Sequence, residues 1–391
     1  MQIFLCSLFF VQPALTRSPV RATLSLAQSN FQPFFFFRRT QMMSNTVTLV
    51  LVGDTNLQDR SDPAAAFEHV LTRLKSANVL FGHLEGPLSP PSSDPATPDI
   101  PHKAGWRHSH PTMVKGLQAA GFAAMCCASN VTYGRQAVLN TLATLDAANI
   151  KHCGVGIDLE EARRPALVER AGVRFGFLSY TSVFWPVGHA AERDAPGVAT
   201  IKATTAYQPG SRALEMPGVS PVIVTTPDPS ELAAMEMDIK NLRDRVDIMV
   251  VSCHWGVSGS SQVQDYQRAI GRAAISAGAD IVMGHHPHVI QGIELWQGRP
   301  IFYSLGNFVF DWERMRGKHL DGLLVCCDIS TCRLANVSVV PARRNSSNNI
   351  ELLDPTGAEG RRIVEQLAVL STEMNTKLTL SATAIAVEGI N

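Results

Sequence analysis

From Thr46 onward, short apolar runs rich in β-branched residues alternate with segments of helical periodicity, and this alternation limits the folds open to the chain. The run TVTLVLVGD at 46–54 predicts a buried strand that ends in a loop. Residues 135–150 place apolar side chains three and four positions apart, which predicts a helix. Strands that alternate with helices of this length indicate βαβ units. We therefore expect an α/β fold with a central sheet and helices on both faces, and ligands at the carboxyl ends of the strands.

The same pattern predicts the domain organisation. We expect one domain over 43–345, followed at 346–391 by a C-terminal helix and tail. An irregular insertion rich in Pro, Gly and Thr interrupts the domain at about 185–230, and an insertion of this kind near a site is often a lid or specificity loop. A helix is predicted near 158–170.

The charge balance separates the first 42 residues from the rest. The 391 residues contain 34 basic and 34 acidic side chains, so nothing in the net charge favours nucleic-acid binding. Residues 1–42 contain four Arg and no acidic residue. We expect this segment to be disordered or a leader, unless the natural start is Met43.

The compartment is inferred from the N-terminal segment and the cysteines. The apolar stretch at 3–15 is too short to span a bilayer and gives no firm membrane anchor. The eight cysteines form no CxxC pair, and most lie in apolar runs, where a thiol is a small buried group and a disulfide framework is not needed. We expect a cytoplasmic protein, the alternative being export or membrane association through residues 1–42.

Polar side chains follow several of the predicted strands at the point where each strand ends. They are Asp54, Glu85, Asn130, His254, the run His285-His286-Pro287-His288, and Asn307. Carboxylates, amide oxygens and imidazoles are the ligands of divalent transition metals such as Mn, Fe or Zn. Carboxylates from two strands can bridge two ions about 3.5–4 Å apart, which activates water for attack on a substrate. The sequence therefore predicts a divalent metal site, with two ions as the expected number.

Taken singly, most of these residues have a purely structural explanation. Asp54 follows a glycine, as turn and N-cap residues do. Glu85 alone reads as a solvated loop acid, and Asn130 alone as a turn residue. His254, at the end of a buried strand, needs a partner of some kind. The two imidazoles that flank Pro287 are a poor choice for packing, and the occurrence of the whole set after strands favours the metal site.

The motifs resemble a known family. Residues 254–311, with HWG, GADIVMGHHPHVIQGIEL and GRPIFYSLGNFVFD, closely resemble the CapA family of poly-γ-glutamate capsule biosynthesis proteins. GDTNLQ at 53–58, HLEGPL at 83–88 and the segment 128–156 fit the same family in the same order. CapA proteins look similar to calcineurin-like metallophosphoesterases, which implies a four-layer αββα sandwich with two metal ions. The metal ligands implied by the resemblance are Asp54, Glu85, Asn130, His254, His286 and His288.

The chain departs from the family pattern at two motifs. Metallophosphoesterases usually have Asp-x-His at the first motif, where this chain has Asn56 in the place of the imidazole. Members of the family commonly have Asn-Asn-His at the third motif, where this chain has Ser129-Asn130-Val131. A histidine that would protonate a leaving group is therefore missing.

Two functions remain open from the sequence. The first is a hydrolase that cuts a phosphoester or a γ-linked amide, with His285 or His83 as the general acid and Asn307 and Trp255 in contact with the substrate. The second is a non-catalytic accessory protein that binds an anionic polymer or its precursor in the metal cleft, which the loss of the third-motif His favours. Both imply an anionic small molecule or polymer as partner, and neither fixes an oligomeric state. Candidate contacts to that partner in the insertion are Trp185, His189, Arg193 and Tyr207.

Overall fold

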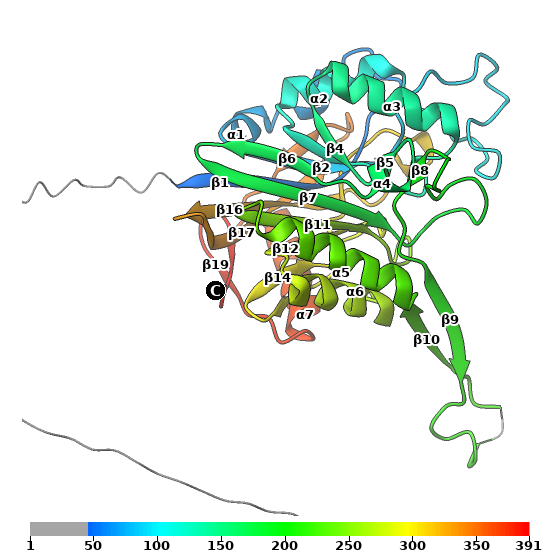
Figure 1. Ribbon diagram of the computed structural model, residues 1–391. Helices are drawn as coiled ribbons and strands as arrows, with labels where there is room; N and C mark the ends of the chain where they lie inside the picture. Colours follow the sequence, from blue (N-terminus) through cyan, green and yellow to red (C-terminus); the bar gives the residue numbers. More distant parts are fainter. Residues whose placement is uncertain (1–45, 217, 391) are drawn as a thin grey trace, which may run out of the picture. The chain divides into compact units, whose positions relative to one another are not determined.

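The computed structural model describes residues 46–216 and 218–390, and these residues form two large sheets that face each other, with helices on the outer face of each sheet (Figure 1). The four-layer α/β arrangement implied by the family resemblance is confirmed. The single central sheet expected from the alternation alone is wrong, because the strands divide between two sheets. The leader predicted at 1–42 lies outside the described residues.

The first sheet contains the strands from the beginning and the end of the described chain. Its order is β19-β20-β17-β16-β1-β2-β3-β4, with β15 paired to β1 and β18 paired to β17. Strand β1 runs parallel to β2 and β15 and antiparallel to β16. The strands are β1 (Val47–Asn56), β2 (Val79–Leu84), β3 (Ala124–Cys126), β4 (Lys151–Cys153), β15 (Asn307–Phe310), β16 (Asp321–Ser330), β17 (Arg333–Arg344), β18 (Ile350–Leu352), β19 (Leu378–Leu380) and β20 (Ile385–Val387).

The second sheet comes from the middle of the chain and has the order β13-β14-β12-β11-β7-β6. Strands β7, β11, β12 and β14 run parallel, so their carboxyl ends lie at one edge. Its strands are β6 (Ala166–Arg170), β7 (Val173–Thr181), β11 (Ile248–His254), β12 (Ile281–His285), β13 (Ile293–Trp296) and β14 (Arg299–Phe302).

Apolar side chains from both sheets form the core between them. Phe81 of β2 stacks on Phe177 of β7, with ring centroids 4.2 Å apart. Burial of a large apolar side chain contributes about 1.5–3 kcal/mol, so this layer holds the two sheets in a fixed relation. Helix α7 (Ala358–Thr372) inserts Ile363 and Leu367 into the same core, against β13 and β17.

The remaining helices cover the outer faces and leave the strand ends open. On the first sheet, Leu74, Leu117 and Val138 pack against the outward side chains of β1 and β2. On the second sheet, Ile239 and Ile270 do the same for β11 and β12. The elements concerned are η1 (Ala64–Phe67), α1 (Leu71–Lys75), η2 (Pro111–Met113), α2 (Val114–Ala120), α3 (Arg135–Ala147), α5 (Pro229–Arg243) and α6 (Asp265–Ala277).

Three predicted segments differ in the structure. The helix expected at 158–170 is only α4 (Leu159–Ala162), and β6 begins soon after Pro165, which cannot continue a helix. The expected irregular insertion contains β8 (Gly197–Val198), which pairs with β5 (Val155–Gly156), and the hairpin of β9 (Ala203–Gln208) and β10 (Val222–Pro227), which projects beside α6 in Figure 1. The expected C-terminal tail is instead β19 and β20, which extend the first sheet.

The short 3-10 helix η3 (Glu313–Met315) lies in the loop between β15 and β16. Within residues 46–216 and 218–390, no helix combines the length and the apolar character that crossing a bilayer requires.

Candidate metal centre

The first sheet places two carboxylates and one imidazole at the ends of its central strands. Asp54 lies near the end of β1, in register with His83 of β2 and Asn307 of β15. Glu85 follows β2 directly, and its backbone N–H bonds the carbonyl of Thr55. Asp54, His83 and Glu85 are buried. These strands are parallel, so their ends meet at one point, as the sequence predicts.

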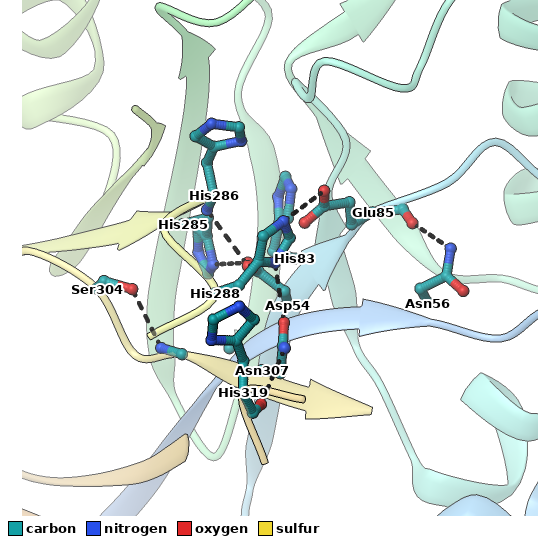
Figure 2. A network of polar contacts seen from close by, with 12 residues as sticks. Asp54, Asn56, His83, Glu85, His285, His286, His288, Ser304, Asn307 and His319 are labelled. Atoms are coloured by element: carbon teal, nitrogen blue, oxygen red, sulfur yellow. Dashed lines mark hydrogen bonds and ion pairs between the residues drawn. The ribbon is translucent and has the colours of Figure 1, made fainter. Parts of the chain in front are cut away.

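The second sheet places four imidazoles opposite these carboxylates. His254 ends β11 and pairs in register with His285, which ends β12. His286 and His288 follow in the loop with φ angles of 89° and 60°, a left-handed conformation that costs a residue with a side chain about 1–3 kcal/mol. Such strain persists only where the surroundings impose it. Here the turn brings a ring nitrogen of His286 and one of His288 within 4.8 Å of a carboxylate oxygen of Glu85 from the first sheet, and a dashed line in Figure 2 joins His288 to Glu85.

Asp54 joins the two sheets. His285 Nδ1 lies 2.9 Å from Asp54 Oδ1, and His288 Nδ1 lies 3.3 Å from Asp54 Oδ2 (Figure 2). The backbone N–H of His286 donates to the same carboxylate at 3.3 Å. Burial alone would raise the pKa of Asp54, but the hydrogen bonds and charges of His285 and His288 outweigh it and hold that pKa well below its usual value. Asp54 is therefore a fixed negative charge at the centre of the site.

Glu85 and His288 form a second carboxylate–imidazole pair between the two sheets. His288 Nε2 lies 3.6 Å from Glu85 Oε1, and His288 Nδ1 lies 3.0 Å from Asn307 Oδ1. Burial raises the pKa of Glu85 to about 8. Burial alone would lower the pKa of His288, but the carboxylates of Glu85 and Asp54 raise it to about 9. Because both pKa values are raised, Glu85 and His288 keep their protons near neutral pH when no cation is bound. A bound cation would displace these protons.

His83 is connected to His254 by a chain of hydrogen bonds below the site. Burial raises the pKa of the Cys126 thiol well above its usual value, so the thiol keeps its proton and donates to the carbonyl of Gly82 at 3.2 Å. The sulfur is then the acceptor for Ser252 Oγ at 3.0 Å and for His83 Nδ1 at 3.4 Å. His83 Nε2 is left as the acceptor for His254 Nδ1 at 3.0 Å. The chain of bonds thus leaves a lone pair on His254 Nε2, which faces the site.

The role of general acid predicted for His83 stays a prediction. Its two ring nitrogens contact Cys126 and His254, and its side chain is buried. His285 is also buried, with Nδ1 on Asp54 and its ring stacked on His83 at a centroid distance of 4.4 Å. The structure places both residues in the floor of the site.

Several buried polar atoms of the site have no hydrogen-bond partner among the described residues, and they fit a divalent cation. These atoms are Glu85 Oε2, Asn130 Oδ1, His254 Nε2, His285 Nε2 and His286 Nδ1. Buried polar groups are normally hydrogen-bonded, so a set of orphaned oxygen and nitrogen acceptors in one place points to an ion. Carboxylate, amide and imidazole donors of this kind suit Mn, Fe or Zn. Burial lowers the pKa of His254 and of His286, whose pKa is about 3, so both imidazoles are neutral and able to bind a metal.

Three overlapping groups of side chains are close enough to hold an ion, and in each group one ligand atom per residue lies within 4.8 Å of the others. The groups are Glu85 with His286 and His288, Glu85 with His83 and His254, and His83 with Cys126 and His285. The first has the best donors, because the nitrogens of His83 are engaged and the thiol of Cys126 is protonated. Glu85 belongs to two groups, as a bridging carboxylate would.

The other predicted residues lie in different surroundings. Asn307 lines the site through its contact with His288, and its amide nitrogen donates to the carbonyl of His319 at 3.1 Å. Asn130 has a buried Oδ1 without a hydrogen-bond partner among the described residues, and its role as a ligand stays a prediction. The substrate contact predicted for Trp255 stays a prediction. Its ring is buried in the core of the second sheet, and its indole N–H donates to the carbonyl of Tyr303.

The residues predicted in the insertion separate into two places. Trp185 and His189 lie beside the third motif, where Trp185 Nε1 donates to the carbonyl of Asn130 at 3.2 Å and His189 Nε2 lies 3.0 Å from the carbonyl of Ser129. Tyr207 is 70 % exposed on β9, in the projecting hairpin. The contact with an anionic ligand predicted for these residues and for Arg193 stays a prediction.

The sequence analysis missed a cationic and aromatic rim. Lys103 comes from the proline-rich loop between β2 and η2, and its ammonium lies over the rings of Trp106 and Trp312. The combination of a lysine and a tryptophan three residues apart, inside a loop that follows Glu85, was the available signal. Asn56, which stands in the place of the first-motif imidazole, donates from its amide nitrogen to the carbonyl of Glu85 at 2.7 Å and holds the chain that carries this residue.

The sequence matches a known family over most of the described chain. The profile of the family described as bacterial capsule synthesis protein PGA_cap matches residues 47–312. A PGA biosynthesis protein CapA of Bacillus subtilis is 31 % identical over 259 residues, which cover 65 % of this chain and 59 % of that protein. A capsule biosynthesis protein CapA of Bacillus anthracis is 28 % identical over 306 residues, which cover 75 % of this chain and 67 % of that protein.

A third relative is named as an accessory protein rather than as a CapA protein. It is a probable polyglutamine synthesis accessory protein of Mycobacterium tuberculosis, 32 % identical over 213 residues, which cover 53 % of this chain and 50 % of that protein. The chain thus spans between half and two thirds of the length of these relatives.

Proposed function

The chain belongs to the bacterial capsule synthesis protein PGA_cap family, and from this premise we propose that it acts in capsule polymer synthesis as a metal-dependent hydrolase of a phosphoester or an amide. The observation that carries the proposal is the set of unpartnered donor atoms that two sheets bring together at their strand ends. A site built only for packing would satisfy these atoms internally.

The protein residues supply the charge and the geometry. Asp54 and Glu85 offer two carboxylates, and His254, His286 and His288 offer nitrogens, so a divalent cation would find oxygen and nitrogen ligands of the usual kinds. When bound, such cations supply a Lewis acid and an activated water. We propose that the site takes two divalent ions, of Mn, Fe or Zn, and that Glu85 would help to hold them.

Positioning is the second contribution of the chain. Asp54 orients His285 and His288, and His83 orients His254, so the ligand rings cannot rotate away. Partners of this kind fix ligand tautomers and are usually worth 10–100-fold in metal affinity. His83 and His285 are buried, so we propose that the proton for the leaving group comes from solvent.

The second candidate is an accessory protein that binds an anionic polymer or its precursor without cutting it. The observation that favours it is Val131, which stands where the family usually has His and packs in an apolar cluster with Ile100 and Trp106. The M. tuberculosis relative named as an accessory protein agrees with it. The number of unpartnered donors favours the hydrolase, because a binding cleft needs fewer of them.

The first test combines metal analysis with turnover. Purified protein is loaded with Mn²⁺, Fe²⁺ or Zn²⁺, its metal equivalents per chain are counted, and hydrolysis of p-nitrophenyl phosphate and γ-glutamyl-p-nitroanilide is measured before and after EDTA treatment. We expect two equivalents and EDTA-sensitive turnover of one substrate, with turnover reduced at least 100-fold by His286→Ala, which removes a ligand. His69→Ala is the control, because His69 is exposed and its ion-pair partners within the described part of the chain are Glu68 and Glu351.

The outcome separates the two candidates. Bound metal with no turnover of either substrate contradicts the hydrolase and leaves the accessory role. Turnover that His286→Ala leaves unchanged contradicts the assignment of the site. We also propose an anionic small molecule or polymer as partner and a cytoplasmic location, which fractionation of cells that express the full chain tests.

A further inference from the structure

Lys103 stands at the rim of the metal centre, held between two tryptophans. Its ammonium nitrogen lies 4.8 Å from the ring centroid of Trp312 and 5.3 Å from that of Trp106. The two indole rings meet edge to face with centroids 5.3 Å apart. A cation over an aromatic face is attracted by the ring, so the two rings stabilise one position of a side chain that is otherwise flexible.

The rings themselves are fixed by hydrogen bonds. Trp312 Nε1 donates to the carbonyl of Gly105 at 3.2 Å, and Trp106 Nε1 donates to His108 Nδ1 at 3.3 Å. The backbone N–H of Trp106 bonds the carbonyl of Lys103, which closes a tight turn. These bonds join the loop after β2 to the loop after β15. The surrounding packing therefore fixes the position of Lys103, whereas the side chain of an ordinary surface lysine moves freely in solvent.

The ammonium of Lys103 has no carboxylate within ion-pair distance and no hydrogen-bond acceptor among residues 46–216 and 218–390. The side chain is half-buried, and burial lowers the pKa of Lys103, opposed by the charge of Glu85. Trp106, one of the two rings under the ammonium, has its Cζ2 atom 3.6 Å from the place of a Cβ on Gly86, the residue after Glu85, so Lys103 is held beside the metal centre. The charge of Lys103 also opposes the rise in the pKa of Glu85. An ammonium has three N–H donors, and a partly desolvated one with none of them used is suited to a ligand anion.

The charges around Lys103 also favour an anionic ligand. Arg314 lies over the outer face of Trp312, 5.9 Å from its centroid, and adds a second cation at the same rim. Glu313 is exposed and forms no ion pair with either cation. The carboxylate whose charge acts on Lys103 is that of Glu85, a residue of the candidate metal centre.

We propose that Lys103, held between Trp106 and Trp312, binds a second anionic group of the substrate, a carboxylate or a phosphate, while the metal centre holds the first. This inference rests on the proposed function and adds a substrate class to it: the ligand carries two anionic groups and spans from the ions to the rim. The aromatic rings exclude water from the ion pair, which strengthens it relative to a pair in solvent.

Binding of small anions to the metal-loaded protein tests the inference without any need for turnover. The probes are the dicarboxylates from malonate to adipate, acetate as the single-anion reference, and inorganic phosphate, each titrated by calorimetry and by tryptophan fluorescence. We expect one dicarboxylate, or phosphate, to bind about 10–100-fold more weakly to Lys103→Met than to wild type, as the loss of a charged hydrogen bond predicts. Lys103→Arg should restore binding to within about threefold, while acetate binds all three proteins equally.

Lys115→Met is the matched control, because Lys115 is exposed on α2 and forms no ion pair within the described part of the chain. Metal equivalents and circular dichroism show whether each variant is folded and loaded. A loss confined to dicarboxylates identifies the second group as a carboxylate, and a loss confined to phosphate identifies it as a phosphate. Equal affinity of wild type and folded, loaded Lys103→Met for every probe overturns the inference. If Lys103→Met binds a probe more weakly than the wild type, while the wild type hydrolyses no substrate, this inference holds and only the proposed hydrolase activity is contradicted.

Discussion

The two sheets contribute different chemistry to one site. The first sheet brings the carboxylates Asp54 and Glu85, and the second brings His254, His285 and the loop of His286 and His288. Neither sheet alone has the donor set of a transition-metal site, because one lacks nitrogen ligands with free lone pairs and the other lacks negative charge. The difference shows that the packing of the sheets, rather than any local motif, assembles the metal centre.

The exception to this division is His83, an imidazole on the carboxylate sheet. It bonds His254 across the gap and leaves its own nitrogens engaged. Asp54 makes a second connection from the same sheet, to His285 and His288 of the other sheet. The first sheet therefore orients imidazoles of the second through two separate residues, and the comparison between the sheets can be tested by breaking one connection at a time.

The largest effect is expected for Asp54→Asn. The substitution keeps the shape but removes the charge that His285 and His288 share, and the loss of one partner from a buried pair costs about 3–5 kcal/mol. We expect the free energy of unfolding of the metal-free protein to fall by this amount in urea titrations, and the metal content to fall to one equivalent or less. Asp244→Asn is the control, because Asp244 is exposed after α5. A variant that keeps two ions and wild-type stability would contradict the view of Asp54 as the link between the sheets.

The next effect concerns pH in the metal-free protein. The folded pKa of Glu85 is about 8 against an ordinary 4.5, and that of His288 is about 9 against 6.5, so the folded state holds extra protons between pH 6.5 and 8 and loses stability as pH rises. The pKa values of His83, His254 and His286 are lowered, so the unfolded chain binds more protons below pH 6.5 and stability falls as pH falls.

Stability of the EDTA-treated protein should therefore be greatest near pH 6.5. Each net proton changes the free energy of unfolding by about 1.4 kcal/mol per pH unit, which gives a loss of about 2–4 kcal/mol from pH 6.5 to 8. Urea titrations from pH 5 to 9 measure it. Metal-loaded protein should instead gain stability over the upper range, because ions compete with protons for the same atoms. A monotonic rise in the stability of the metal-free protein from pH 6.5 to 8 would be inconsistent with the buried pair.

The smallest effect is expected for His83→Asn. The shorter side chain cannot reach His254 Nδ1, so the ring of His254 loses its orientation while every ligand remains. We expect metal affinity to fall about 10–100-fold, measured by competition with a chelator. Ser252→Ala is the matched control, since it removes a buried hydrogen bond to Cys126 in the same chain of bonds but one step farther from His254. Equal losses of metal affinity in both variants would indicate that the whole buried hydrogen-bond network is disturbed, and would contradict a specific role of His83 in orienting His254.

The sequence was sufficient to predict most of the donors. Asp54, Glu85, His254 and His286 each follow an apolar strand, and parallel strand ends converge whatever the details of the fold. The sequence alone did not show which strands share a sheet. Strand β16 pairs with β1 across most of the length of the described chain, and no local pattern contains such a pairing.

Other features depended on tertiary contacts. Trp255 follows a predicted ligand directly, but alternation along the strand turns it into the core. The segment 166–170 has apolar residues that fit a helix, yet Pro165 and the neighbouring β7 make it a strand. Lys103 lies in a loop without periodicity, so only the packing of Trp106 and Trp312 reveals its position.

The position of β1 has a consequence for biosynthesis. Its antiparallel neighbour β16 is translated near the end of the chain, after all the imidazoles of the site. During translation the emerging first strand therefore has one hydrogen-bonding edge uncovered, and such an edge favours wrong association. We expect nascent chains that stop before β16 to associate wrongly through this edge, because β16 covers it along Val47–Val52.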